Sequence, residues 1–331
     1  MSLTRRHAAR LLAAAVAPAW ATGARATGSA PSFPERGQSL RLIVPFAAGG
    51  GVDSAARLLA EQLRRQHGLS VLVENKAGAS GTLGGQAVRA APADGTTLLF
   101  SAATHVMTRH VLASAPYDPQ ADFAPVARVG EAPLMLVVPP TQPQKTLAEV
   151  LAAIRRQPEG WTAAIPAAGA PSHLATLRLA RQAGLGLTYV PYKGTQPAAM
   201  DVAGGHVQLL LDSMISLLPL VKGGRVRALA VTSKARSPLV PDVPTMAEAG
   251  APGFTFESWY GVWAPRGTPA ERIAGLNTAI NAAGTELAKS GAWAALGISP
   301  VSESPEQFRQ QIAAEVAEGV ELLRAAGFRP E

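Results

Sequence analysis

Short apolar runs alternate with segments of helical periodicity in the first third of the chain. The runs at 40–44, 71–74 and 97–101 are brief and nearly uninterrupted, which is typical of strands buried on both faces. Helices are predicted between them, over 54–67 and 82–90. A strand, helix, strand, helix, strand order predicts a parallel sheet with right-handed crossovers.

The same alternation continues to residue 231, and the last third of the chain is mostly helical. A strand that ends at Pro139 predicts the first crossing between domains, and the run 259–263 predicts a strand that returns to the first domain near residue 256. We therefore expect an α/β protein with a first domain over 38–138 plus 256–331 and a second domain over 139–255. Further strands are predicted at 126–129, 134–138, 161–165, 187–190, 207–211 and 226–231, and further helices at 147–157, 173–183, 271–288 and 305–324.

One local pattern recurs four times: an apolar strand, a loop of glycine, alanine and serine, and then a helix. It occurs at 46–53, 77–82, 166–173 and 193–197, twice in each predicted domain. Such loops place bare backbone N–H groups at a helix N-terminus, where they attract anions. In the first loop three successive glycines allow a tight turn, and Asp53 or Ser54 is expected to cap the helix. We interpret this loop as the site of a ligand carboxylate.

Composition limits the classes of chemistry available. Hydrophobic residues make up 47% of the chain but aromatic residues only 5%, so the core is expected to consist of small aliphatic side chains. The chain contains no cysteine, which excludes disulfides, thiolate metal sites and a cysteine nucleophile.

The first residues are typical of a secretory signal peptide over 1–26. A basic head is followed by an apolar run, 11–19, that is too short to span a membrane, and Ala24-Arg25-Ala26 offers a cleavage site. The pair Arg5-Arg6 admits the twin-arginine route as well as the general secretory one. The formal net charge of +7 falls when the arginines of this leader are removed, and no basic run is interleaved with aromatic residues, so nucleic acid is not expected as a partner.

Several short motifs resemble those of the solute receptors of tripartite tricarboxylate transporters, the Bug or TctC family. The resemblance extends from about residue 38 to the C-terminus. The motifs are Val44-Pro45-Phe46 with Gly49-Gly50 and Asp53; Glu74-Asn75-Lys76 with Gly78-Ala79-Ser80-Gly81; Asp94-Gly95-Thr96; Tyr117-Asp118-Pro119; His173-Leu174; Val190-Pro191-Tyr192-Lys193-Gly194; Asp242-Val243-Pro244-Thr245; and Trp259-Tyr260-Gly261.

The resemblance implies a two-domain fold like that of type II periplasmic binding proteins, with a central cleft. It implies a periplasmic receptor, monomeric and without enzymatic activity, cofactor or metal, that closes on a small carboxylate and delivers it to the subunits of a membrane permease. Two loops of the first domain are expected to hold the carboxylate, and two loops of the second are expected to close over it. The candidate ligand-binding residues are Phe46, Ala48, Gly49, Gly50, Asp53, Ala79, Ser80, Gly81, Ser101, Ala168, Gly169, Thr195 and Asp212.

The spacing of the first loop also admits an NAD(P)-dependent oxidoreductase with a Rossmann-like fold. Gly49-x-Gly51-x-x-Ser54 lacks the third glycine of that fingerprint, but Glu74 stands where an acid that binds ribose would lie. An export signal argues against a soluble nicotinamide cofactor. Ser80 lacks the Gly-x-Ser-x-Gly context of a hydrolase nucleophile.

Four further side chains have two interpretations each. Asp212 can receive a ligand ammonium group or hold backbone N–H groups of its own loop, and the sequence does not decide between these. For His173 a capping or packing role is preferred to ligand contact, and for Lys193 a solvated position is preferred to pairing with a carboxylate. His105 lacks metal-ligand spacing and is predicted to lie at the surface.

Overall fold

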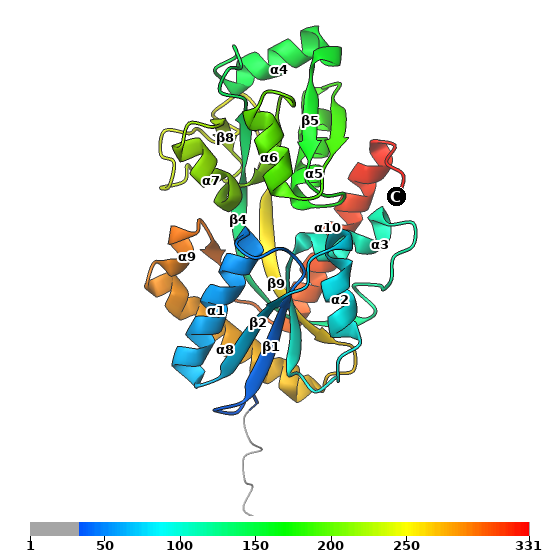
Figure 1. Cartoon of the computed structure of the whole chain (residues 1–331), viewed down its shortest axis with the longest axis vertical. Coiled ribbons are helices and arrows are strands. Elements are labelled where there is room, and N and C mark those ends of the chain that lie inside the picture. Colours follow the sequence, from blue (N-terminus) through cyan, green and yellow to red (C-terminus); the bar gives the residue numbers. More distant parts are fainter. Residues whose placement is uncertain (1–32, 331) are drawn as a thin grey trace, which may run out of the picture. The chain divides into compact units, whose positions relative to one another are not determined.

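Parallel and antiparallel strands share one eight-stranded sheet (Figure 1). β1 (Ser39–Val44) lies between two parallel neighbours, β2 (Ser70–Asn75) and β3 (Thr97–Ala102). β3 pairs with the antiparallel β9 (Glu257–Pro265), which pairs in turn with β4 (Phe123–Val138). This computed structural model describes residues 33–330, so the signal peptide predicted at 1–26 lies outside the described residues.

A second set of strands is built on the far half of β4. β7 (Leu210–Ser213) and β8 (Arg227–Val231) both pair with β4 in the antiparallel sense. β5 (Thr162–Ile165) pairs in parallel with β6 (Thr188–Pro191), and a parallel bridge between Ala163 and Leu209 joins β5 to the chain that leads into β7. We call the part built on β1–β3 and β9 the first lobe and the part built on β5–β8 the second lobe.

β4 is a single strand of 16 residues, and the prediction of two separate strands at 126–129 and 134–138 was wrong. Its partner is β9 up to Pro133 and β7 and β8 from Leu134 onward, so the change of partner precedes the crossing predicted at Pro139. Proline interrupts most strands because it lacks an N–H group. Here the register shifts just after Pro125, and Pro133 lies where the partner changes, so neither proline ends the strand.

The predicted helices are present with small shifts at their ends. The helices are α1 (Gly51–His67), α2 (Thr82–Arg89), α3 (Thr108–Val111), α4 (Leu147–Arg156), α5 (Pro171–Ala183), α6 (Thr195–Ala203), α7 (Met214–Lys222), α8 (Ala270–Lys289), α9 (Ala292–Ala295) and α10 (Pro305–Ala325). Three 3₁₀ turns, η1 (Ala79–Gly81), η2 (Ala103–Met107) and η3 (Pro158–Gly160), complete the set, and β10 (Ser299–Pro300) pairs with β4. The sequence pattern missed α3, α7, α9 and η2.

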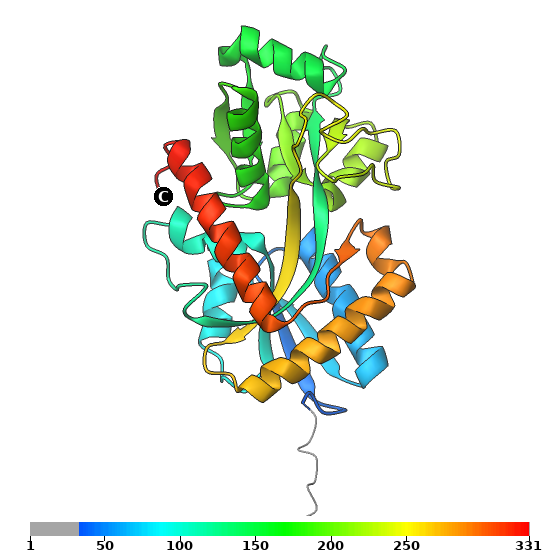
Figure 2. The same ribbon diagram turned by 180° about the vertical axis from the view of Figure 1, so that it is seen from behind.

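α10 packs along β4 and reaches from α8 to α5 (Figure 2). Arg178 of α5 lies 3.5 Å from Glu318 of α10, and Arg181 lies 4.0 Å from Glu321. These pairs are exposed, so each contributes little on its own. The helix therefore contacts both lobes and must slide or bend if the lobes move.

A group of carboxyl side chains lies where β4, β9 and α10 meet. Glu315 accepts a hydrogen bond from the indole N–H of the buried Trp259, and burial raises the pKa of Glu315 to about 7. Burial and the neighbouring Glu131 raise the pKa of Glu257 to about 7 as well. Arg128 pairs with Glu131 at 3.3 Å and with Glu303 at 3.0 Å. Glu257 and Glu315 therefore bind and release protons near neutral pH.

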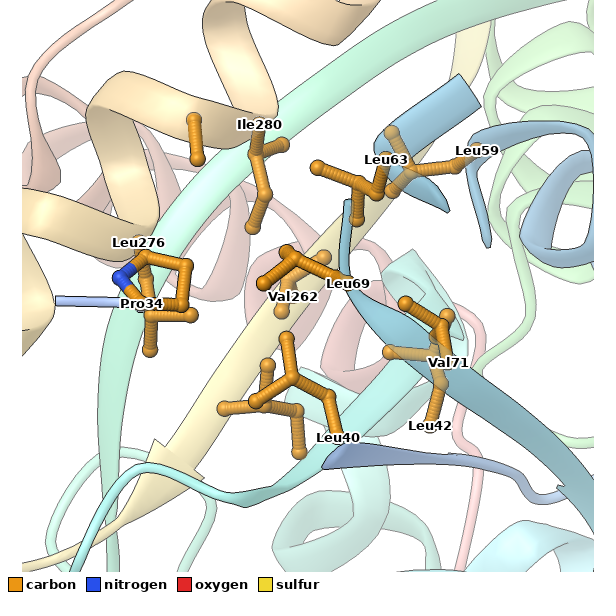
Figure 3. Close-up of a pocket in the computed structure, with 12 residues that line it drawn as sticks. Pro34, Leu40, Leu42, Leu59, Leu63, Leu69, Val71, Val262, Leu276 and Ile280 are labelled. Atoms are coloured by element: carbon orange, nitrogen blue, oxygen red, sulfur yellow. The ribbon is translucent and has the colours of Figure 1, made fainter. Parts of the chain in front are cut away.

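Apolar side chains fill the space between the sheet and the helices. The apolar face of α1 is buried, and its Leu59 and Leu63 pack with β1 and α8. A void of about 10 Å³ lies there, and Figure 3 shows the residues that line it, which include Leu40, Val262 and Ile280. A void of this size has room for about one water molecule and offers it no polar partner. It is a packing defect of the core and not a ligand site.

His105 is buried, and the prediction that it lies at the surface was wrong. Its ring makes edge contacts with Phe123 and Trp263, and its Nδ1 lies 3.4 Å from the hydroxyl of Tyr117. Burial lowers the pKa of His105 to about 3, so the ring is neutral and serves as a member of an aromatic cluster. No local sequence pattern indicates this burial, because the aromatic side chains enclose His105 only once the chain has folded.

Candidate functional site

The loops singled out in the sequence gather at two edges that face each other. The carboxyl ends of the parallel strands β1, β2 and β3 form one edge, and those of β5, β6 and β7 form the other. A Cβ placed on Gly51 at the start of α1 would lie 3.5 Å from the Tyr260 hydroxyl and 3.7 Å from Ile215 of α7. The first turn of α1 therefore contacts the second lobe.

A second contact joins the lobes beside α5. A Cβ on Gly169 would lie 2.7 Å from Val111 and 2.9 Å from Met107, and φ of Gly169 is +67°. Only glycine combines this close approach with this backbone conformation. The loop that precedes α5 is thus held against η2 and α3 of the first lobe.

The loop between β1 and α1 presents backbone donors. α1 begins at Gly51, with Gly50 as its N-cap and no side-chain cap, so the expectation that Asp53 or Ser54 caps the helix was wrong. Within the described residues, the N–H groups of Gly50, Gly51 and Val52 donate to no protein acceptor. Ala48 is exposed and Phe46 partly so. Unpaired N–H groups at the start of a long helix favour an anion.

The buried carboxylate of Asp53 stabilises this loop by accepting hydrogen bonds from it and from neighbouring side chains. It is 3% exposed, and its Oδ2 accepts hydrogen bonds from the Gly49 N–H at 2.9 Å and from Arg57 Nε at 3.0 Å. Asn75 at the end of β2 donates its Nδ2 to Asp53 Oδ1 at 2.9 Å and to the Phe46 carbonyl at 3.0 Å. The Gly49 N–H is therefore already engaged by a carboxylate of the chain.

The loop between β2 and α2 has an unusual backbone. Gly78, Ala79, Ser80 and Gly81 all have positive φ, of 134°, 46°, 55° and 89°. Among the described residues, Ala79 and Ser80 are the two non-glycine residues with positive φ. Strain of this kind is found at functional sites, where the surrounding structure enforces it. The N–H groups of Ala79 and Ser80 donate to no acceptor in the described part of the protein.

Replacing Ala79 by glycine is expected to stabilise the protein by ~0.5–1 kcal/mol. A left-handed conformation destabilises a residue with a Cβ by ~1–2 kcal/mol, and glycine removes this strain. Glycine also loses more backbone entropy on folding, which offsets part of the gain in stability. Urea unfolding measures the difference. Ala77→Gly is the matched control, since Ala77 is exposed and has no positive φ, and it should lower stability. Equal effects of the two substitutions would contradict the strain.

Two buried hydroxyl groups lie at the carboxyl ends of β3 and β7. Ser101 of β3 is 1% exposed and pairs with Gly261, beside Tyr260. The Oγ atoms of Ser101 and Ser213 are buried and have no hydrogen-bond partner among the described residues. Burial raises the pKa of Tyr260 to about 12, so its hydroxyl stays protonated. Buried polar groups without a partner are uncommon and call for an explanation, such as a ligand or a bound water.

The loops of the second lobe support one another. The Gly194 N–H donates to the carbonyl of Pro166 at 2.8 Å, which joins the loop after β6 to the loop after β5. His173 in the first turn of α5 accepts from the Gly169 N–H at 3.1 Å through Nδ1. Burial lowers the pKa of His173 to about 4, so the ring stays neutral and able to accept. Ala168 is partly exposed between these fixed points, and Lys193 is exposed as predicted.

Asp212 lies at the end of β7 and is 7% exposed. Its Oδ2 accepts from the Thr195 hydroxyl at 2.7 Å, and its Oδ1 accepts from the N–H of Ser213, also at 2.7 Å. Burial raises the pKa of Asp212 above its usual value, against the effect of these two bonds. Of the two interpretations left open by the sequence, the hydrogen bonds fit the one in which Asp212 holds its own loop.

All four predicted loops therefore lie at the facing edges. The sequence did not single out Asn75, Ser213 or Tyr260 as members of the site. A polar residue directly after the strand predicted at 71–74 was the available signal for Asn75, and Ser213 lies two residues after the strand predicted at 207–211. Tyr260 also packs within the core, since it stacks on Phe100.

Two negative findings apply to residues 33–330. They contain no group of three or more His, Cys, Asp or Glu side chains placed to hold a metal ion. In the same range, no helix is both long enough and apolar enough to cross a membrane.

Comparison with known proteins identifies the family. Residues 55–328 match the family model of the tripartite tricarboxylate transporter family receptor, TctC. The chain belongs to this family. It is a family of solute-binding receptors and not of enzymes. The chain is 38% identical to the protein BugT of Bordetella pertussis over 307 residues, which cover 92% of this chain and 94% of BugT.

Solved structures show the same fold. R. palustris Rpa4515 with adipate has a TM-score of 0.81 and 34% identity, covering 90% of this chain and 100% of that one. MatC (Rpa3494) from Rhodopseudomonas palustris with bound malate has a TM-score of 0.74 and 32% identity, covering 88% and 100%. The periplasmic binding protein BugD has a TM-score of 0.78 at 34% identity, covering 90% and 100%. The α/β, two-domain architecture expected from the sequence is thereby confirmed.

Proposed function

We propose that this protein is an extracytoplasmic receptor that captures a small carboxylate between its two lobes. The single observation that supports this most is the set of backbone N–H groups at Gly50–Val52 and Ala79–Ser80, which donate to no acceptor within residues 33–330. They belong to adjacent loops at one edge of the sheet. Each hydrogen bond from such an N–H group to a charged acceptor contributes roughly 1.5–3 kcal/mol, which favours binding of a carboxylate over a neutral group.

The second lobe supplies the opposite wall of the proposed site. Ala168, Gly169 and Thr195 lie on loops that are tied to one another by hydrogen bonds, and the unpartnered hydroxyl of Ser213 lies beside them. Relatives bind adipate and malate, which are both dicarboxylates. We infer a ligand of the di- or tricarboxylate or acidic amino acid type.

Capture proceeds by hinge closure in this proposal. The lobes are joined through β4 and β9, near Pro133–Leu134 and residue 256, and the ligand stabilises the closed form by its higher affinity for that form. The closed monomer then delivers its ligand to the permease subunits of a tripartite tricarboxylate-type transporter. Export to the periplasm with removal of residues 1–26 is part of the same proposal.

A thermal-shift screen tests the proposed ligand class. Succinate, malate, adipate, citrate, aspartate and glutamate form the panel, with NAD⁺ and NADP⁺ as the comparison for a nucleotide-binding protein. A ligand at a hundred times its Kd adds ~2.7 kcal/mol of stability, so at least one acid should raise the Tm by several degrees. A shift with NAD⁺ or NADP⁺ alone would contradict the proposal. Mass spectrometry of small acids that copurify from the native host then identifies the ligand.

A further inference from the structure

Three side chains behind the first loop form a closed hydrogen-bonded ring. Asp53 accepts hydrogen bonds from both Arg57 and Asn75, as described above, and Arg57 closes the ring by donating from Nη2 to Asn75 Oδ1 at 2.9 Å. Asp53 is buried, whereas the side chain of Arg57 is 51% exposed. We call Asp53, Arg57 and Asn75 the loop triad.

The loop triad fixes the backbone at two points of the β1–α1 loop. The Phe46 carbonyl is bound by Asn75 and the Gly49 N–H by Asp53. Both bonds anchor the loop to the end of β2 and to the first turn of α1. Once these two groups are engaged, the next donors along the chain, the N–H groups of Gly50, Gly51 and Val52, are left without protein partners.

The loop triad also determines the net charge beside the proposed site. A buried carboxylate so close to an anion would repel it unless its charge is balanced. Burial alone would raise the pKa of Asp53, but the bonds from Arg57, the Gly49 N–H and Asn75 outweigh burial and lower it. Asp53 is therefore ionised, and Arg57 is the cation that compensates it.

We propose that Asp53, Arg57 and Asn75 are positioning residues that set the shape and the net charge of the carboxylate-binding loop without contacting the ligand. This inference rests on the proposed function, because it assigns a role within that site. It reassigns Asp53 from a ligand contact to a support of the loop.

The test begins with the acid from the panel that binds the unaltered protein. Arg57→Gln should weaken its binding about ten-fold in calorimetry at low salt, because Asp53 is then uncompensated. The loss should shrink as salt rises and screens the charge. It should also shrink in the double variant Asp53→Asn/Arg57→Gln, and Arg57→Lys should retain most of the affinity. Arg64→Gln, which removes an exposed pair with Glu61 in the same helix, is the matched control and should bind normally.

A measurement without ligand separates this inference from the proposed function. Hydrogen exchange of the Gly49 amide, which donates to Asp53, should be faster in Asn75→Ala than in the unaltered protein, while the Tm confirms that both are folded. If no acid binds, the proposed function fails, and the exchange result still shows whether the loop triad positions the β1–α1 loop. Unchanged exchange, or a loss of affinity in Arg57→Gln that neither salt nor the double variant relieves, would overturn the inference.

Discussion

Replacing Glu315 by glutamine is expected to raise the free energy of unfolding at pH 8 by ~2 kcal/mol. The pKa of Glu315 is about 7 in the folded protein, because its carboxyl group is buried against Trp259, and the ordinary value is 4.5. A change of one pKa unit corresponds to ~1.4 kcal/mol. We set the expected gain in stability below the value that the full change would give, because the side chain is partly exposed and solvent screens its charge. Glutamine keeps an acceptor for the indole N–H and removes the buried charge.

The sign of the pH dependence follows from the raised pKa. A carboxyl group that binds its proton more tightly when folded favours the folded state fully below its unfolded pKa, and this contribution is lost as pH rises through 7. Glu315→Gln should therefore stabilise at pH 8 and have almost no effect at pH 4.5. Urea unfolding at both pH values measures this. Glu321→Gln, which replaces a side chain of α10 that is 47% exposed, should show no such gain, and equal behaviour of the two variants would contradict burial of the Glu315 charge.

Replacing Gly84 by alanine should lower stability by ~2–3 kcal/mol, although alanine usually improves a helix by ~0.5–1 kcal/mol. A Cβ on Gly84 would lie 2.7 Å from the Cβ and 2.8 Å from the Cα of Pro45. Because the Cα of Pro45 belongs to the backbone at the end of β1, α2 must move away. That shift carries the loop 78–81 with it, so affinity for the ligand should fall as well.

Chemical denaturation and calorimetry with the bound acid measure the two effects of Gly84→Ala. Gly160→Ala is the matched control, because its Cβ would have no neighbour nearer than 4.0 Å and Gly160 has no positive φ. Its stability should change by no more than ~0.5 kcal/mol. A stabilising effect of Gly84→Ala would show that α2 does not pack tightly on β1.

The fold could be predicted where the signal was local. The apolar run of β1 and the helical periodicity of α1 are local features of the sequence, and the strand at 40–44 and the helix at 54–67 were both predicted correctly. β4 was divided in error because proline is locally unfavourable in a strand, whereas Pro125 and Pro133 are tolerated through a register shift and a change of partner. His105 was misplaced for a similar reason, since Phe123 and Trp263 enclose it only after folding.

The candidate site could be predicted as a set of loops but not as a set of roles. Gly49 and Gly81 signal a turn in any sequence, and their loops do lie at the facing edges. Asp53 stands at a helix start, where a capping role is the local expectation, yet its carboxylate reaches back to Gly49 and across to Asn75. Asn75 is 22 residues away from Asp53 in the chain, and such a partnership has no local signature.

The single strand β4 has a consequence for the order in which the molecule can assemble. All four of its partners, β7, β8, β9 and β10, follow it in the sequence, and the pairing with β9 brings together segments separated by more than a hundred residues. Pairing over such distances is slow. A nascent chain shorter than 257 residues lacks β9, so the sheet of the first lobe cannot be completed until most of the chain has been synthesised, whereas all strands of the second lobe are present by residue 231.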